Sequence, residues 1–200
     1  MSSCSFATQT KRLGQQDMES LLKNNRASKG EPSYIGVVHR LDQPVEGVMV
    51  FAKTKEAASD LSRQVQMKEA DKFYYAVTDG VPVEKTGSLE DYLLRDGRTN
   101  TSKVVKEGTA GAKKARLSYE VLAEDGTHAI LKIQLDTGRH HQIRVQLSHA
   151  GYPIAGDRKY NADSSATLGD HLKLCSYKIG FVHPKTHKKM EFEIENPYTC

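Results

Sequence analysis

The chain has 200 residues, a formal net charge of +4 and 38% hydrophobic residues. A chain of this length buries about 70% of its unfolded surface, so it can fold as one domain without a disulfide or a metal. Its three cysteines, an odd number with no CxxC spacing, fit a reducing compartment. The sequence shows neither a signal peptide nor an apolar run of the ~20 residues that span a membrane. We therefore expect a cytoplasmic protein and no metal site.

The N-terminal segment, residues 1–33, is polar and weakly patterned. It contains one helical candidate, over residues 17–23, and we expect it to be partly ordered. No internal repeat, low-complexity tract or linker divides the rest of the chain. We therefore predict one folded domain over residues 34–200.

The first regular elements are predicted after this segment. The apolar run Gly47–Ala52 is typical of a buried strand. Thr54 fits the N-cap of a helix that ends at about Lys68. That helix would bury one face through residues spaced four apart (Ala57, Leu61 and Val65).

The middle of the chain predicts antiparallel strands. Residues 72–77 form an aromatic and β-branched run that ends at Asp79–Gly80, which is typical of a strand. Residues 117–122 and 129–135 alternate apolar and polar side chains around the turn at residues 124–126. This pattern predicts a β-hairpin.

A basic segment precedes this hairpin, over residues 95–116. Against two acids it carries seven basic residues (Arg95, Arg98, Lys103, Lys106, Lys113, Lys114 and Arg116). We interpret it as a loop-rich insertion. A solvated polar hairpin is the commoner structure for such a segment, and a surface that contacts nucleic-acid phosphates is the alternative.

The C-terminal part predicts a short helix and two more strands. Thr137–Gly138 opens the helix, which runs from about Arg139 to Ala150, and strands are expected over residues 172–181 and 189–194. Because hairpins dominate and no βαβ rhythm occurs, the chain predicts an α+β fold on a mixed, mainly antiparallel sheet.

Two segments carry most of the chemistry. Residues 137–144, TGRHHQIR, gather two arginines, two histidines and an amide with no acid, while residues 38–42, VHRLD, offer one carboxylate, Asp42. At a helix N-terminus the backbone N–H groups of Gly138 and Arg139 would suit a phosphate.

The arginine at the end of the second segment has two possible roles. If Arg144 meets Asp42, the attraction lowers the pKa of the acid by about 1–3 units and keeps it ionised as a nucleophile or base. The alternative is a structural tie between the two residues. The sequence contains no Walker loop, GxGxxG, GxSxG or HExxH motif that would favour another chemistry.

These segments belong to a set of motifs that resembles the RluA-type pseudouridine synthases, and the resemblance runs in family order from about residue 37 to residue 195. Its blocks are HRLD at 39–42 with Gly47, KxYxA at 72–76, KxAxxxYEVL at 113–122, TGRxHQIR at 137–144, GxPIxGDxxY at 151–160 and FxHP at 181–184.

The resemblance implies the pseudouridine synthase catalytic domain, with flanking helices and an RNA-binding cleft, and the isomerisation of uridine to pseudouridine in RNA. It implies that Asp42 is the catalytic aspartate, that Tyr74 stacks on the target base and that Arg144 pairs with the aspartate. Arg40 matches a residue that helps to expel the base, and Arg139 matches a phosphate contact. The other RNA-binding positions that the motifs imply are Lys72, Gly138, His141 and Gln142.

This chemistry implies a partner and no cofactor. Moving uracil from N1 to C5 linkage involves no redox change and no net water, so neither a metal nor a nucleotide cofactor is expected. Everting the nucleotide costs a few kcal/mol, and stacking on an aromatic ring returns about 1–3 kcal/mol. We expect the partner to be a stem-loop of ribosomal or transfer RNA and the protein to be a monomer.

Two departures from the family pattern leave a second hypothesis open. Residues 43–47 are QPVEG, so Glu46 stands where relatives carry a small polar residue. The family's leading Lys-Pro-x-Gly strand is also absent from the sequence. The alternative is therefore a catalytically impaired relative that still binds RNA.

Overall fold

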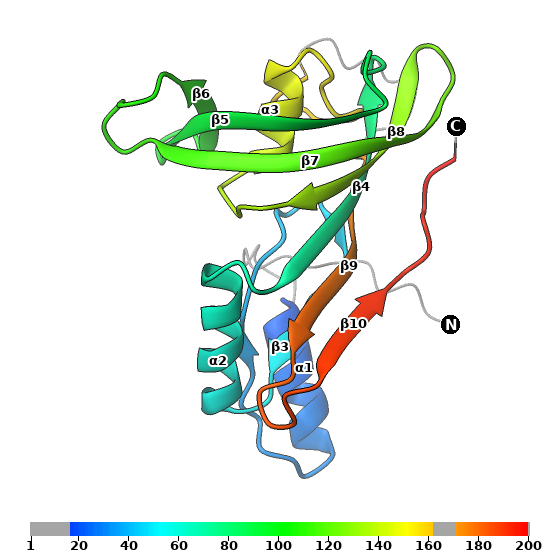
Figure 1. Ribbon diagram of the computed structural model, residues 1–200. Coiled ribbons are helices and arrows are strands. Elements are labelled where there is room, and N and C mark those ends of the chain that lie inside the picture. The colour runs from blue at the N-terminus through cyan, green and yellow to red at the C-terminus, as the bar shows by residue number, and fades with distance from the viewer. Residues whose placement is uncertain (1–16, 162–170, 200) are drawn as a thin grey trace. The chain divides into compact units, whose positions relative to one another are not determined.

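The computed structural model describes residues 17–161 and 171–199. Two compact units divide the chain: residues 1–72 with 176–195 form the first, and residues 73–175 with 196–200 form the second. The chain passes between the units within β4 (Asp71–Asp79), within β9 (Leu174–Val182) and again after residue 195. Mixed helices and strands of this kind confirm the predicted α+β class (Figure 1).

The first unit begins with α1 (Met18–Ser28). Asp17 caps this helix, because its carboxylate accepts the Ser20 N–H at 2.7 Å. The helix continues beyond the predicted end at residue 23. The remainder of the predicted partly ordered segment, residues 1–16, lies outside the described residues.

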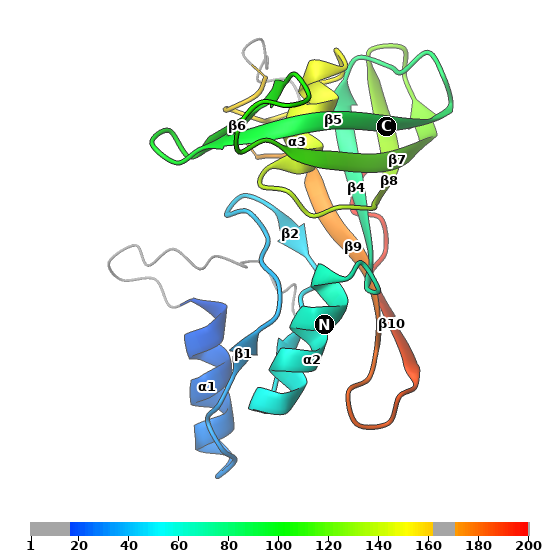
Figure 2. The ribbon, with the colours of Figure 1, turned by 60° about the vertical axis from the view of Figure 1, so that its left-hand side comes forward.

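A two-stranded sheet and a helix follow. β1 (Gly36–Val37) pairs antiparallel with β3 (Phe51–Ala52), and α2 (Lys55–Gln66) packs against both strands (Figure 2). The predicted cap is confirmed, since the Thr54 hydroxyl accepts the Ala57 N–H at 3.2 Å.

One polar residue fastens α2 to the C-terminal hairpin. Gln64 is only 2% exposed, and its amide bonds both backbone groups of Val182, donating to the carbonyl at 2.8 Å and accepting the N–H at 2.9 Å. Val182 ends β9, which pairs antiparallel with β10 (Lys189–Glu193). The predicted C-terminal strands are confirmed. The apolar pattern of α2 did not predict that Gln64 is buried and bonds β9.

The predicted strand over residues 47–52 is divided in two, because β2 (Glu46–Gly47) pairs with β9 before β3 begins. Gly47 has a φ of +125°, and a Cβ there would lie 2.1 Å from the Ser176 carbonyl oxygen. The Val48 N–H donates to the same oxygen at 2.7 Å. Only glycine allows this close approach of two backbones.

The second unit is built on long antiparallel strands (Figure 1). Each pairs with the next in the series β4, β8 (His128–Leu135), β7 (Lys113–Glu124), β5 (Thr86–Asp96) and β6 (Thr101–Val105). The full sheet order is β10-β9-β4-β8-β7-β5-β6, with β2 on β9. The predicted strand at 72–77 and the predicted hairpin around residue 125 are both confirmed.

The basic segment, residues 95–116, divides equally between strands and connections. Eleven of its 22 residues form the end of β5, the whole of β6 and the start of β7, and the other eleven connect these strands. The predicted loops are present, but the segment is part of the sheet and includes the β5–β6 hairpin. Leu93 and Ala115, from β5 and β7, pack with Val145 of α3 (Gln142–His149). The adjacent pair Leu93–Leu94 breaks the period-two alternation that would have revealed β5.

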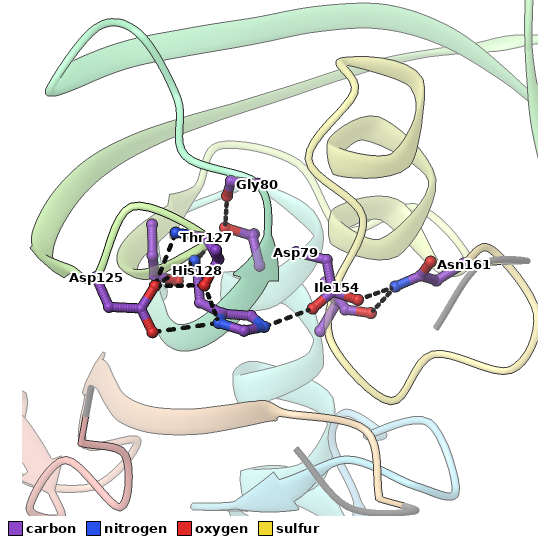
Figure 3. A network of polar contacts seen from close by, with 9 residues as sticks. Asp79, Gly80, Asp125, Thr127, His128, Ile154 and Asn161 are labelled. Carbon is purple, nitrogen blue, oxygen red and sulfur yellow. Dashed lines mark hydrogen bonds and ion pairs between the residues drawn. The ribbon is translucent and has the colours of Figure 1, made fainter. Parts of the chain in front are cut away.

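A polar network closes one end of the second unit (Figure 3). The backbone N–H of His128 and the Thr127 hydroxyl hold the pKa of Asp125 well below its usual range. The His128 ring lies 3.3 Å from an Asp125 oxygen and 3.4 Å from an Asp79 oxygen, and Asn161 donates to Asp79. The β7–β8 turn, the end of β4 and the loop after α3 are thereby joined.

Within residues 17–161 and 171–199, no helix is both long and apolar enough to cross a bilayer.

We predict that Gly47→Ala destabilises the protein more than Gly126→Ala does. Both glycines have positive φ, +125° and +87°, but a Cβ at Gly126 meets nothing within 4 Å. Backbone strain alone costs about 1–2 kcal/mol, and the clash with β9 adds about 1–3 kcal/mol at Gly47. Urea unfolding of both variants measures the difference. Equal losses of stability would contradict the close contact between β2 and β9.

Candidate functional site

Asp42 begins a closed turn in the first unit. Its carbonyl accepts the Val45 N–H at 2.8 Å across Gln43 and Pro44. Val45 is buried, with 4% exposure, and β2 follows directly. The half-buried Asp42 carboxylate is therefore carried by backbone that is fixed on its C-terminal side.

His39 fixes the same segment on its N-terminal side. Its Nε2 accepts the Val50 N–H at 3.1 Å. Burial, and secondarily the nearby Lys72 ammonium, lower the pKa of His39 to about 4. The ring is therefore neutral at pH 7 and carries its proton on Nδ1. Lys72, at the start of β4, thus lies near the HRLD segment.

Two charged residues close to Asp42 in the sequence are exposed: Arg40 and Glu46. The Arg40 side chain is accessible to a nucleic acid, as its predicted role requires. Glu46 is also at the surface, so its carboxylate is not buried in the turn that carries Asp42.

Arg144 lies in the second unit and forms a buried ion pair. Its Nε and Nη2 donate to the two carboxylate oxygens of Asp157 at 2.8 and 2.7 Å. The residues are 4% and 1% exposed, respectively. The guanidinium also lies 5.1 Å from the centre of the Tyr160 ring, a cation–π distance. Asp42 belongs to the other unit, so its pairing with Arg144 stays a prediction.

Asp157 also shapes its own loop. One of its oxygens accepts the backbone N–H groups of Lys159 and Tyr160 at 2.9 and 3.3 Å. A buried ion pair is favourable when such additional hydrogen bonds satisfy the carboxylate. The GDxxY motif contained both Asp157 and Tyr160, but only the fold shows that Arg144 is their partner.

Gln142 holds the loop before α3. Its Oε1 accepts from the Thr137 hydroxyl at 2.7 Å and from the Arg139 N–H at 3.0 Å. Its Nε2 donates to the Arg116 carbonyl and to the Gln146 side chain, both at 3.0 Å. All four hydrogen bonds of this amide are therefore internal.

The start of α3 differs from the prediction. The helix begins at Gln142, and its N-cap, His141, has a left-handed φ of +53°. The Arg139 N–H is bonded to Gln142, so it does not belong to an open helix terminus. Arg139 is half-buried and donates from Nε to the Lys114 carbonyl at 2.9 Å, while Gly138 is exposed.

His141 is buried and neutral. Burial, followed by the Arg144 charge, lowers the pKa of His141 to about 3. Its Nδ1 lies 2.6 Å from the Tyr160 hydroxyl, which accepts the Ser102 N–H at 2.8 Å. The histidine and tyrosine thus join β6 to the loops on both sides of α3.

Tyr74 lies within β4 of the second unit. It is 8% exposed and pairs in register with Ile133 of β8. Its stacking on a base stays a prediction.

Residues 4–149 match the RNA pseudouridylate synthase family. The chain belongs to this family. An uncharacterized RNA pseudouridine synthase of Aquifex aeolicus is 37% identical over 174 residues, which cover 82% of this chain and 54% of the relative. The dual-specificity RNA pseudouridine synthase RluA of Vibrio parahaemolyticus is 34% identical, with coverages of 76% and 62%.

These relatives identify the RluA type. The chain spans about half the length of the curated relatives that it matches. Human RNA pseudouridylate synthase domain containing 4 has the same fold, with a TM-score of 0.76 at 22% identity over 92% of this chain and 80% of that one. The predicted pseudouridine synthase fold is thus confirmed.

We predict that stability falls as the pH drops from about 6.5 to 4. The pKa values of His39 and His141 are about 4 and about 3 in the folded protein. Both lie below the unfolded value of ~6.5, so the unfolded chain binds more protons in this window. Each residue contributes up to about 1.4 kcal/mol per pH unit.

Urea unfolding at several pH values measures this slope. The slope of the unfolding free energy against pH gives the number of protons taken up on unfolding. In His39→Gln and in His141→Gln this number should fall by about one. An unchanged slope in both variants would show that the histidines protonate without opposing folding.

We also predict that Asp157→Ala destabilises the protein by about 3–5 kcal/mol, because it leaves the Arg144 guanidinium buried without its carboxylate. The double variant Arg144→Met with Asp157→Leu should recover much of this loss. Chemical denaturation of the single and double variants completes the comparison. Additive losses would argue against a coupled pair.

Proposed function

We propose that this chain isomerises uridine to pseudouridine in RNA, with Asp42 acting on the ribose. The observation that carries the proposal is the position of Asp42 in the HRLD motif, inside the family match over residues 4–149. The closed turn at Val45 and the neutral His39 hold the backbone on either side of this residue.

The reaction conserves every atom of the nucleotide except for an exchange of protons. The N1–C1′ bond breaks, a C1′–C5 bond forms, the hydrogen at C5 leaves to solvent and N1 gains one. No electron acceptor, net water or transferred group is needed. The carboxylate either attacks C1′ or removes the C2′ proton, and both routes require it to be ionised.

Arg144 is proposed to keep Asp42 ionised. A guanidinium close to a carboxylate lowers the pKa of the acid by about 1–3 units. The bidentate pair with Asp157 supports this role, because it fixes the plane of the guanidinium at 2.7–2.8 Å contacts inside the protein. A preoriented cation stabilises developing charge without reorganisation during the reaction.

Tyr74 is proposed to stack on the everted base, and Arg40 to help displace the base from its helix. Eversion costs a few kcal/mol, and one aromatic stacking contact supplies about 1–3 kcal/mol. The exposure of Arg40 supports its role. Tyr74 is 8% exposed, so stacking on the base requires the protein around this residue to open.

The remaining motif residues divide into two groups. Lys72, Gly138 and Arg139 are proposed to contact the RNA backbone directly. His141 and Gln142 are buried and bonded internally, so we propose that they act on RNA by holding the loop that presents Arg139.

Relatives suggest the first substrate to test. The proteins at 34% identity include a ribosomal large subunit pseudouridine synthase D of Neisseria meningitidis serogroup B, which this chain covers to 45%. We therefore propose large-subunit ribosomal RNA as the substrate. We also propose a monomer as the active form and the cytoplasm as the place of reaction.

We predict that Asp42→Asn eliminates isomerisation and leaves RNA binding near normal. The amide is isosteric but can serve neither as nucleophile nor as base, so turnover should fall by several orders of magnitude. Release of tritium from C5 of uridine in an unmodified large-subunit ribosomal RNA transcript measures turnover, and a filter-binding assay measures affinity.

Glu46→Gln is the matched control, because it removes the neighbouring exposed carboxylate and should retain activity. Appreciable tritium release by Asp42→Asn would remove Asp42 from the central role. Normal RNA binding without release by the unsubstituted protein would favour the impaired RNA-binding relative.

A further inference from the structure

Three basic side chains converge on Asn100, at the end of the β5–β6 turn. Its Oδ1 accepts from Arg95 Nη2 at 3.3 Å and lies 3.2 Å from His140 Nε2. Its backbone carbonyl accepts from Lys159 Nζ at 2.9 Å. These four residues, which we call the Asn100 cluster, come from β5, the turn and the loops on either side of α3.

The cluster is anchored in the second unit. His140 Nδ1 lies 2.9 Å from the hydroxyl of Ser102, which is 6% exposed. The His140 ring stacks on His141 with centroids 3.7 Å apart. The backbone of Asn100 has a φ of +51°, a conformation that asparagine tolerates better than most residues. The basic groups are thus held by the fold, although they lie at the surface.

Within residues 17–161 and 171–199, neither Arg95 nor Lys159 forms an ion pair with a carboxylate. The acids on the surrounding elements are engaged elsewhere. Asp96 caps the N–H groups of Arg98 and Thr99, Asp91 accepts from Gln146 and faces His149, and Asp157 pairs with Arg144.

We propose that the Asn100 cluster binds one phosphate of the RNA backbone. An arginine fork and a lysine ammonium offer donors that match phosphate oxygens. His140 helps to position them, because its ring nitrogens lie within hydrogen-bonding distance of Ser102 and Asn100. Asn100 gathers them through neutral oxygens, which orient the cations without neutralising them. His140 and Lys159 occupy x positions of the TGRxHQIR and GDxxY motifs. The family motifs therefore do not specify the residues of this site.

The proposal rests on the proposed RNA substrate, and Asn100→Asp tests it. The aspartate is isosteric, tolerates the same backbone and places a carboxylate between Arg95 and Lys159. The new ion pairs should keep the melting temperature unchanged or raise it. RNA affinity should fall, and the slope of log affinity against log salt should decrease by about one, as expected for one lost phosphate contact.

Fluorescence anisotropy with a labelled stem-loop RNA, between about 50 and 200 mM salt, measures both quantities. Lys103→Gln is the matched control, because it changes the net charge by the same amount in the same hairpin. Lys103 follows Ser102 in β6, so its side chain points to the opposite face of the sheet. The control should retain more affinity than Asn100→Asp.

The outcomes separate this site from the catalytic proposal. Equal loss of affinity in both variants, or no loss in Asn100→Asp, overturns the phosphate site while the isomerase proposal stands. Failure of the unsubstituted protein to bind RNA overturns both proposals.

Discussion

The buried ion pair of Arg144 and Asp157 is the constraint on which the second unit's site depends. A guanidinium with 4% exposure requires a carboxylate at hydrogen-bonding distance, and Asp157 supplies both oxygens. The same carboxylate fixes the backbone of Lys159 and Tyr160. Tyr160 then reaches His141 and β6. One charge requirement therefore determines the positions of the loops before and after α3, and with them the proposed phosphate site.

In the first unit, Asp42 lies on a loop whose backbone is bonded on both sides. These hydrogen bonds involve neutral groups: the His39 ring on the N-terminal side and the turn to Val45 on the C-terminal side. Gly47 lets the chain lie directly against the backbone of β9. The loop that carries Asp42 is thus held by neutral groups. In the proposed mechanism, Arg144 and the bound RNA set the reactivity of the Asp42 carboxylate.

Local signals in the sequence were sufficient for much of the fold. Thr54 as an N-cap, the hairpin turn at Asp125 and the alternation of its strands each reflect contacts between residues close in the chain. The sequence did not reveal β5, where Leu93 and Leu94 interrupt the alternation. It also missed the late start of α3, where the Gln142 side chain accepts the Arg139 N–H ahead of the helix. Partners such as Asp157 depend on tertiary contacts that no local pattern encodes.

The most direct measurement is a structure of Asp42→Asn bound to a uridine-containing ribosomal RNA fragment. The expected result is one uridine everted from its helix, with C1′ about 3–3.5 Å from the side chain of residue 42, the distance of a near-attack arrangement. Its base should contact Tyr74, and Arg144 should lie beside residue 42. A uridine that remains stacked, or a nucleotide bound with its ribose far from residue 42, would contradict the proposed chemistry.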